Sequence, residues 1–181
     1  MTADFEELRR ALLALEGPQV VGPDAVSKEM IRHWCEAHED ANPLYTDEKY
    51  AKESRYGGII APPQMIQGWT FPPLWPDGQE MQWRHPEIAS DREPMVSEQV
   101  YAKCNEAGYL GTMAVSTSLE FFEPLYPGDR VTRSMKVVDV TPEKQTRAGI
   151  GPFVTFLFTD TNQKGELVCK QTVTVFKFKP A

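Results

Sequence analysis

The chain has 181 residues, 41% of them hydrophobic and 25% charged, which suits one compact domain over residues 1–181. Its formal net charge of −7 disfavours nucleic-acid binding, because phosphate neutralisation needs clustered Lys and Arg. No apolar stretch approaches the roughly 20 residues that span a bilayer, and the N-terminus lacks a secretory signal pattern, so we expect a cytoplasmic protein without membrane contact.

The first 71 residues are predicted to be mainly helical. Apolar residues recur at helical spacing over residues 4–15, and Gly17-Pro18 ends this N-terminal helix. A second helix is expected to begin near Ser27, a favourable N-cap residue, and to end near Asp40.

Two shorter helices are expected within the same helical and motif region, which covers residues 27–71. The first covers residues 45–53 and ends before a Gly-Gly pair. The second covers residues 64–71, because Pro62 or Pro63 can open a helix and the next proline pair stops it.

A long loop and a sheet are predicted for the rest of the chain. Residues 72–96 contain five prolines and two tryptophans without periodicity, which indicates an irregular loop. The sheet covers residues 97–179, which are rich in Val, Thr, Phe and Leu and are divided by turn signals. The predicted strands are residues 97–104, 112–123, 130–140, 152–161 and 166–179. Helices followed by antiparallel strands indicate an α+β fold with helices on one face of the sheet.

Cysteine and histidine placement argues against a metal site. Cys35, Cys104 and Cys169 are odd in number and far apart, which favours buried thiols over a disulfide framework or a zinc site. His33 and His38 are five residues apart and do not share a helical face well enough to bind one ion. We therefore expect no bound metal.

Two motifs in the helical region carry the functional signal. DANPLY covers residues 40–45, and YGGIIAPP covers residues 56–63. Asn42 precedes a proline and is biased towards an extended conformation, so the first motif is predicted to be a helix-exit turn. This places Asp40 and Tyr45 on or beside a loop.

These motifs resemble the active-site segment of the MaoC-like hydratases and dehydratases, and within them the FAS1-like dehydratase branch. That family has Asp-x-Asn-Pro-x-His and then a His-Gly pair, where this chain has Tyr45 and Pro62-Pro63. The resemblance implies a single hotdog fold, in which a curved antiparallel sheet wraps around a central helix, here shortened. The match is closest to the MaoC domain of the larger subunit of the heteromeric enoyl-CoA hydratase that acts on steroid side chains in actinobacterial cholesterol breakdown, and it covers most of the chain.

The chemistry of that family needs a base and an oxyanion donor. The resemblance implies that Asp and His activate a water, while backbone N–H groups near His-Gly hold the thioester oxygen. Tyr45 is protonated at neutral pH, and Pro62 and Pro63 have no amide hydrogen. We therefore expect no catalytic residue in this chain; Asp40 is interpreted as a turn residue and Tyr45 as an inert aromatic.

The resemblance implies a role for the degenerate site in binding. Met65 and Trp69 share a helical face and are interpreted as core residues that can also border an acyl tunnel. The predicted substrate-binding residues are Asn42, Tyr45, Pro62, Pro63, Met65 and Trp69. Scattered basic residues are either contacts to coenzyme A phosphates or a solvated edge: Lys144, Arg147, Lys177 and Lys179.

The predicted function is that of the non-catalytic, substrate-accommodating subunit of a heteromeric enoyl-CoA hydratase with a bulky, steroid side-chain acyl group. The expected partner is a catalytic MaoC-like hotdog subunit, in a heterodimer or a dimer of heterodimers, and no cofactor is expected beyond the coenzyme A of the substrate. The resemblance also implies contact with a thiolase-like aldolase through a C-terminal extension not present in these residues. The alternatives are a subunit of a long-chain acyl thioester dehydratase and an acyl-CoA-binding scaffold.

Overall fold

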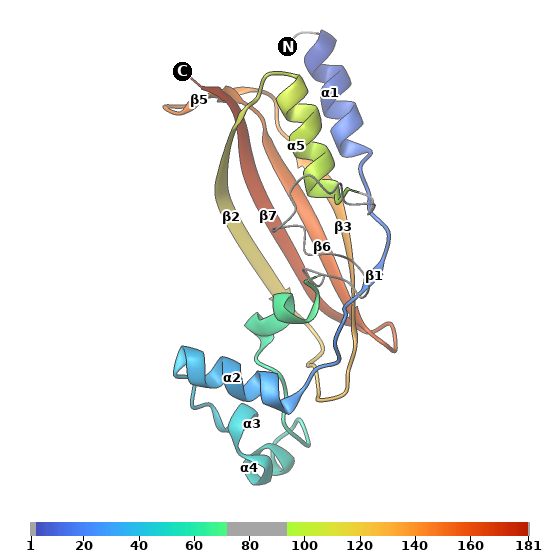
Figure 1. The fold of residues 1–181 in the computed structure, drawn as a ribbon, viewed down its shortest axis with the longest axis vertical. Helices are drawn as coiled ribbons and strands as arrows, with labels where there is room; N and C mark the ends of the chain where they lie inside the picture. Colours follow the sequence, from blue (N-terminus) through green and yellow to red (C-terminus); the bar gives the residue numbers. More distant parts are fainter. Residues whose placement is uncertain (1–2, 72–93, 181) are drawn as a thin grey trace, which may run out of the picture.

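A curved antiparallel sheet forms the body of the protein (Figure 1). The computed structural model describes residues 3–71 and 94–180. Helices α1 and α5 lie side by side over one end of the sheet, near the two termini, while α2 to α4 gather at the opposite end (Figure 1). The motif-bearing segments therefore lie far from the chain termini.

Within the described residues the sheet has seven strands, six of them in the order β1-β3-β6-β7-β5-β4, and β2 also pairs with β7. Their bounds are β1 Val20–Val21, β2 Gly111–Phe121, β3 Val131–Val140, β4 Lys144–Gln145, β5 Gly149–Gly151, β6 Phe153–Asn162 and β7 Leu167–Pro180. The last four predicted strands are confirmed, because β2, β3, β6 and β7 cover them with shifts of at most two residues at their ends. All pairings are antiparallel.

The first predicted strand, residues 97–104, is wrong. This segment belongs to helix α5, Val96–Glu106, whose buried residues Val96, Val100 and Cys104 recur every four positions. The amide of Met95 donates to the carboxylate of Glu98 at 2.7 Å, which satisfies a donor at the helix start. The β-branched Val100 favours a strand, but the four-residue spacing of the buried positions is helical.

The first two predicted helices are confirmed. Helix α1 covers Ala3–Leu13, and helix α2 covers Lys28–His38. The hydroxyl of Ser27 accepts a hydrogen bond from the amide of Met30 at 3.2 Å, so the predicted N-cap is also present.

The single helix predicted over residues 45–53 is instead two helices, α3 Pro43–Thr46 and α4 Glu48–Glu53. Asp47 separates them, because its carboxylate accepts hydrogen bonds from the amides of Lys49 and Tyr50 at 2.9 and 3.0 Å. An N-cap residue starts a new helix and interrupts the preceding one.

The short helix predicted over residues 64–71 is present as a 3₁₀ helix, η1 Pro63–Trp69, which ends two residues earlier than predicted. It packs with α2 and the lower part of the sheet around one apolar cluster, while α1 and α5 cover a second cluster. Within the predicted loop 72–96, residues 72–93 lie outside the described residues and Val96 begins α5. None of the helices described here is long and apolar enough to cross a bilayer.

Candidate functional site

The DANPLY motif is a hydrogen-bonded turn between α2 and α3. Helix α2 ends at Glu39, whose φ of 53° places it in the left-handed region. The carboxylate of Asp40 accepts from the amide of Asn42 at 3.1 Å, and the side chain of Asn42 accepts from the amide of Leu44 at 3.1 Å. Asp40 thus holds the Asn-Pro turn, as interpreted from the sequence.

The second motif is tied to the first through its backbone. The amide of Ile60 donates to the carbonyl of Leu44 at 3.3 Å, and the amide of Ala61 donates to the carbonyl of Leu125 at 2.8 Å. Pro62 and Pro63 carry no amide hydrogen. The four successive positions 60–63 therefore leave no backbone N–H for a substrate oxygen.

The degenerate motif positions line one depression of about 300 Å³. Its lining residues are Trp34, Asp40, Tyr45, Pro62, Pro63, Gln64 and Phe121. Burial, together with a smaller effect of the Asp40 carboxylate, raises the pKa of Tyr45 above its usual value. The phenol therefore stays protonated at neutral pH and cannot serve as the general base.

A second depression of about 250 Å³ also borders Pro62 and Pro63. It is called the acyl groove because of the role proposed for it below. It is mainly apolar, with Arg55 and Tyr56 at one wall and Phe121 and Phe122 at another. Its further lining residues are Ile60, Ala61, Ile66, Glu123, Pro124, Leu125 and Val168. Pro62, Pro63 and Phe121 border both depressions, so the two lie next to one another.

Sequence reasoning missed several of these lining residues, including Trp34, Arg55, Phe121 and Phe122. A partial signal existed, because two consecutive aromatics at the end of a strand cannot both face the core. Phe121 and Phe122 are 42% and 49% exposed, so both remain available for contact.

Three predicted substrate contacts lie outside both depressions. Met65 and Trp69 are 2% and 1% exposed within the apolar cluster under η1, so they are core residues. The side chain of Asn42 is used in the turn before α3. Contact of these three residues with an acyl chain stays a prediction.

Lys177 does not belong to a solvated edge. It is 1% exposed, and its ammonium donates to Asn105 at 2.9 Å and to Thr112 at 2.7 Å. Burial lowers the pKa of Lys177. A coenzyme A phosphate cannot reach this ammonium without movement of α5 or β2, which bear its two hydrogen-bond partners.

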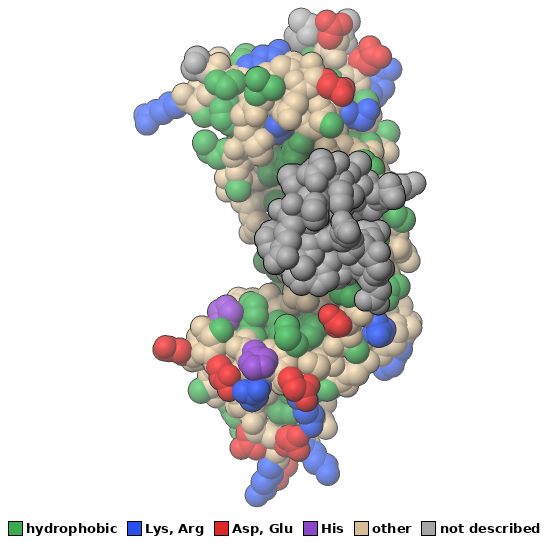
Figure 2. Space-filling view, viewed as in Figure 1, with side chains coloured by type: hydrophobic (Ala, Val, Ile, Leu, Met, Phe, Trp, Pro, Cys, Tyr) green, Lys and Arg blue, Asp and Glu red, His purple; other side chains and the backbone are tan. Residues whose placement is uncertain are grey.

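The other basic candidates lie near the surface. The ammonium groups of Lys144 and Lys179 lie 5.4 and 4.5 Å from the ring centroids of Phe153 and Tyr109. Arg147 is exposed. Acidic and basic side chains are mixed at both ends of the face shown in Figure 2. The basic side chains on this face therefore do not form a continuous basic surface.

The histidines of α2 do not act together. His38 stacks on Trp34 with ring centroids 3.9 Å apart, and its Nδ1 lies 2.9 Å from the Trp34 carbonyl. Over residues 3–71 and 94–180, no group of three or more His, Cys, Asp or Glu side chains could hold a metal ion.

The chain is similar to known proteins. The model of the FAS1-like dehydratase domain region matches residues 20–171. A probable enoyl-CoA hydratase alpha subunit from Thermomonospora curvata is 35% identical over 88% of this chain and 47% of its own length. The 3-oxo-4,17-pregnadiene-20-carboxyl-CoA hydratase alpha subunit of Mycobacterium tuberculosis is 32% identical over 87% of this chain and 46% of its own. The chain thus spans about half the length of these two curated relatives.

The fold matches solved structures over nearly its whole length. A chain of the ChsH1-ChsH2 complex from Mycobacterium tuberculosis is 29% identical, covers 99% of both chains and has a TM-score of 0.82. Solved MaoC-like dehydratases share the fold at 20 to 21% identity. The predicted hotdog fold and the MaoC-like resemblance are confirmed.

Proposed function

The chain belongs to the FAS1-like dehydratase domain family, and from this premise we propose that it is the non-catalytic, substrate-accommodating subunit of a heteromeric enoyl-CoA hydratase. The substrate class is a 2-enoyl-CoA with a bulky acyl group of the steroid side-chain type, and no cofactor is needed beyond its coenzyme A. The curated relatives support the reaction class, since both are hydratase alpha subunits.

One observation carries the non-catalytic role. The depression that unites Asp40, Tyr45 and Pro62-Pro63 offers neither an imidazole nor a free amide from positions 60–63. A hydration needs a group that moves the proton of water and a donor for the developing enolate oxygen. We infer that both functions come from another chain.

The open edge of the sheet supports a partner subunit. Strand β2 has 11 residues and, among the described strands, pairs only with β7. Its side chains Met113 and Val115 are 50% and 48% exposed. The opposite edge is covered, because residues 16–22 run along β3. A long edge strand with exposed apolar side chains is a template for pairing with another sheet, so β2 is where we place the catalytic subunit.

The two adjoining depressions support a bulky acyl group. Pro62, Pro63 and Phe121 border both of them, and η1 ends at Trp69 after only seven residues. In the proposed heteromer the site of this chain is given over to binding, and the partner supplies the Asp and His.

The test compares the chain alone with the chain bound to a catalytic subunit captured from the native host. Both samples are given a steroid side-chain 2-enoyl-CoA, a long-chain 2-enoyl-CoA and crotonyl-CoA, and loss of the conjugated enoyl thioester is followed by absorbance. We expect hydration only by the heteromer, with the steroid thioester as the preferred substrate.

Each other outcome favours a different function. Equal rates for the chain alone and the heteromer would overturn the non-catalytic role. A preference for the long-chain thioester would indicate the dehydratase alternative. Binding of acyl-CoA by the chain without any effect on the partner's turnover would indicate a scaffold.

A further inference from the structure

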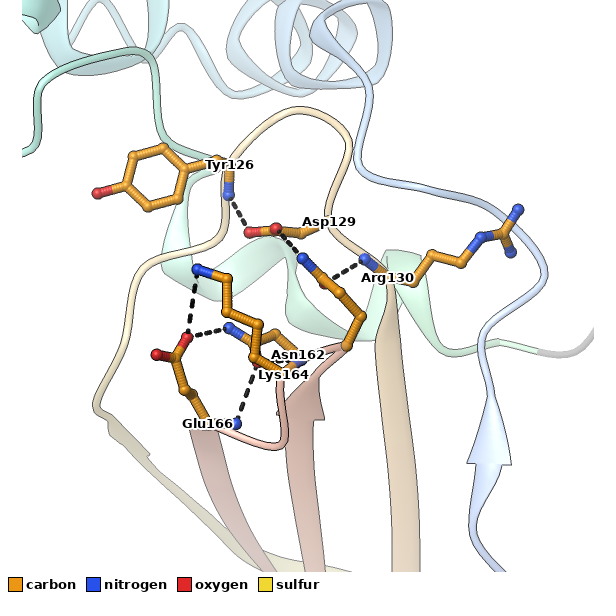
Figure 3. Close-up of polar contacts among 7 residues, drawn as sticks. Tyr126, Asp129, Arg130, Asn162, Lys164 and Glu166 are labelled. Carbon is orange, nitrogen blue, oxygen red and sulfur yellow. Dashed lines mark hydrogen bonds and ion pairs between the residues drawn. The ribbon is translucent and has the colours of Figure 1, made fainter.

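Two turns at the motif end of the sheet are joined by a side-chain bridge (Figure 3). The amide nitrogen of the Gln163 side chain donates to Asp129 Oδ1 at 2.7 Å, and its oxygen accepts from the amide of Arg130 at 3.0 Å. Asp129 Oδ2 accepts from the amide of Tyr126 at 2.7 Å. Asp129 therefore connects the turn before β3 to the turn before β7.

The turn that carries Gln163 has a well-defined backbone. Asn162, which is 5% exposed, accepts hydrogen bonds from the amides of Lys164 and Glu166, each at 3.0 Å. Its own amide group donates to the Glu166 carboxylate at 2.7 Å (Figure 3). Gln163 thus projects from a fixed support towards Asp129.

Tyr126 links the Asp129 turn to the acyl groove. Its hydroxyl donates to the carbonyl of Tyr56 at 3.1 Å, and Tyr56 forms a groove wall together with Arg55. A Cβ added at Gly57 or Gly58 would meet no described atom within 4 Å. The link after Tyr56 is therefore not held by close packing at these two glycines. Tyr56 and Gly57 bond locally to Ser54, and the Tyr126 hydroxyl ties Tyr56 to the turn before β3.

The other end of the same link has an independent anchor. Ala61 donates to the carbonyl of Leu125, and Leu125 is 5% exposed within the apolar cluster under η1. Gln163 is not part of this cluster. Loss of the bridge should therefore loosen the Arg55–Tyr56 wall and leave Ala61 in place.

We propose that the Asp129–Gln163 contact is a positioning device for the Arg55–Tyr56 wall of the acyl groove, acting through the Tyr126 hydroxyl. This rests on the proposed function, in which the groove receives a bulky acyl group. Gln163 touches no substrate and acts only through the two turns. A net contribution of one hydrogen bond corresponds to a change of about 3- to 10-fold in binding.

The test uses charge exchange across the bridge. Gln163→Glu removes the donor and places a second carboxylate beside Asp129, whereas Gln163→Glu with Asp129→Asn restores one donor between the two side chains. Tyr126→Phe removes only the transmitting hydroxyl. Lys164→Ala is the matched control, because Lys164 lies next to Gln163 and its side chain makes only an exposed ion pair at 3.8 Å.

In the reconstituted heteromer, we expect Gln163→Glu and Tyr126→Phe to raise KM for the steroid side-chain enoyl-CoA by about 5-fold at unchanged kcat. KM for crotonyl-CoA should not change, because its four-carbon acyl group is too short to depend on the groove wall. The double variant should restore the original KM. An unchanged KM in both single variants, an equal rise for crotonyl-CoA, or no restoration would overturn the proposal.

Amide hydrogen exchange in the chain alone tests the same contact without activity. The amides of Tyr56 and Gly57 bond to Ser54 and report on the wall. Gln163→Glu should speed the exchange of these two amides and leave the exchange of the Ala61 amide unchanged. The control Lys164→Ala should change neither the exchange of these amides nor the melting temperature. Unchanged exchange at Tyr56 and Gly57 would refute the positioning role, whatever the activity of the heteromer. An inactive heteromer would refute only the proposed function.

Discussion

At the scale of single residues, Tyr45 and the Pro62-Pro63 pair lie against the same depression. The phenol is already protonated at neutral pH and cannot accept a proton, and the prolines have no backbone N–H to donate a hydrogen bond. Because the amides of Ile60 and Ala61 are already bonded, replacing the phenol alone does not rebuild the oxyanion donor. The two losses therefore have to be reversed together.

Tyr45→His in the isolated chain should give no hydration of crotonyl-CoA above background. A missing oxyanion donor typically costs about 100- to 1000-fold in rate, and the imidazole does not replace it. The matched variant adds Pro62→His and Pro63→Gly, which returns an amide hydrogen at both positions. Hydration by Tyr45→His alone at the rate of the triple variant would contradict this reading.

Burial of two thiols makes the free energy of unfolding depend on pH in the alkaline range. It raises the pKa of Cys104 and of Cys169 from 9.0 to about 11. Between these values the native chain keeps protons that the unfolded chain has lost, so this stabilisation is full below pH 9 and is lost as pH rises towards 11. The free energy of unfolding in urea, measured at pH 8 and at pH 10.5, should therefore fall at the higher pH.

The double variant Cys104→Ala/Cys169→Ala isolates the thiols from the tyrosines, whose pKa values burial also raises. Its unfolding free energy should fall less over the same pH interval than that of the unmodified chain. An equal fall would show that the thiols make no contribution.

At the scale of elements, α5 closes the apolar cluster that α1 also covers, near the chain termini. Val100 is fully buried in this cluster. The helix ends where Gly108 takes a φ of 87°, a left-handed conformation that favours glycine. Its orientation follows from packing against the sheet and α1, as Figure 1 shows.

Val100→Ala should lower the free energy of unfolding by about 2 kcal/mol, through lost burial and the cavity left behind. The control is Glu106→Ala at the exposed end of the same helix, with an expected change within about 0.5 kcal/mol. Urea denaturation of both variants measures the difference. Equal values would mean that α5 does not pack as described.

At the scale of the whole molecule, the two edges of the sheet differ. Residues 16–22 cover the β3 edge, whereas β2 pairs with no strand other than β7 within residues 3–71 and 94–180. A second sheet can therefore add at one side only. This asymmetry orients the partner relative to the two depressions, since Phe121 at the end of β2 borders both.

Val115→Lys should weaken association with the catalytic subunit by about tenfold or more, because the interface would bury an unpaired charge. Val138→Lys is the matched control: Val138 is an exposed valine on the inner strand β3, and like Val115 it lies at a break in strand register. Size-exclusion chromatography and isothermal titration calorimetry measure the association of each variant with the catalytic subunit. Equal weakening by both variants would place the interface elsewhere.

Local features of this protein followed from the sequence by itself. The apolar spacing of residues 4–15, the Ser27 cap and four of the strands depend on neighbouring residues, and all are confirmed. The absence of an imidazole at Tyr45 and of amide hydrogens at Pro62 and Pro63 is covalent chemistry, which no fold can change.

Only the tertiary structure decided the rest. Residues 97–104 carry both strand and helix signals, and packing against α1 and the sheet selects α5. Lys177 is buried where its ammonium contacts Asn105 of α5 and Thr112 of β2. The alternating pattern of its strand does not reveal these contacts. The acyl groove joins Tyr56 to Phe121, and the Gln163 bridge joins two turns, because folding brings together residues that are far apart in sequence.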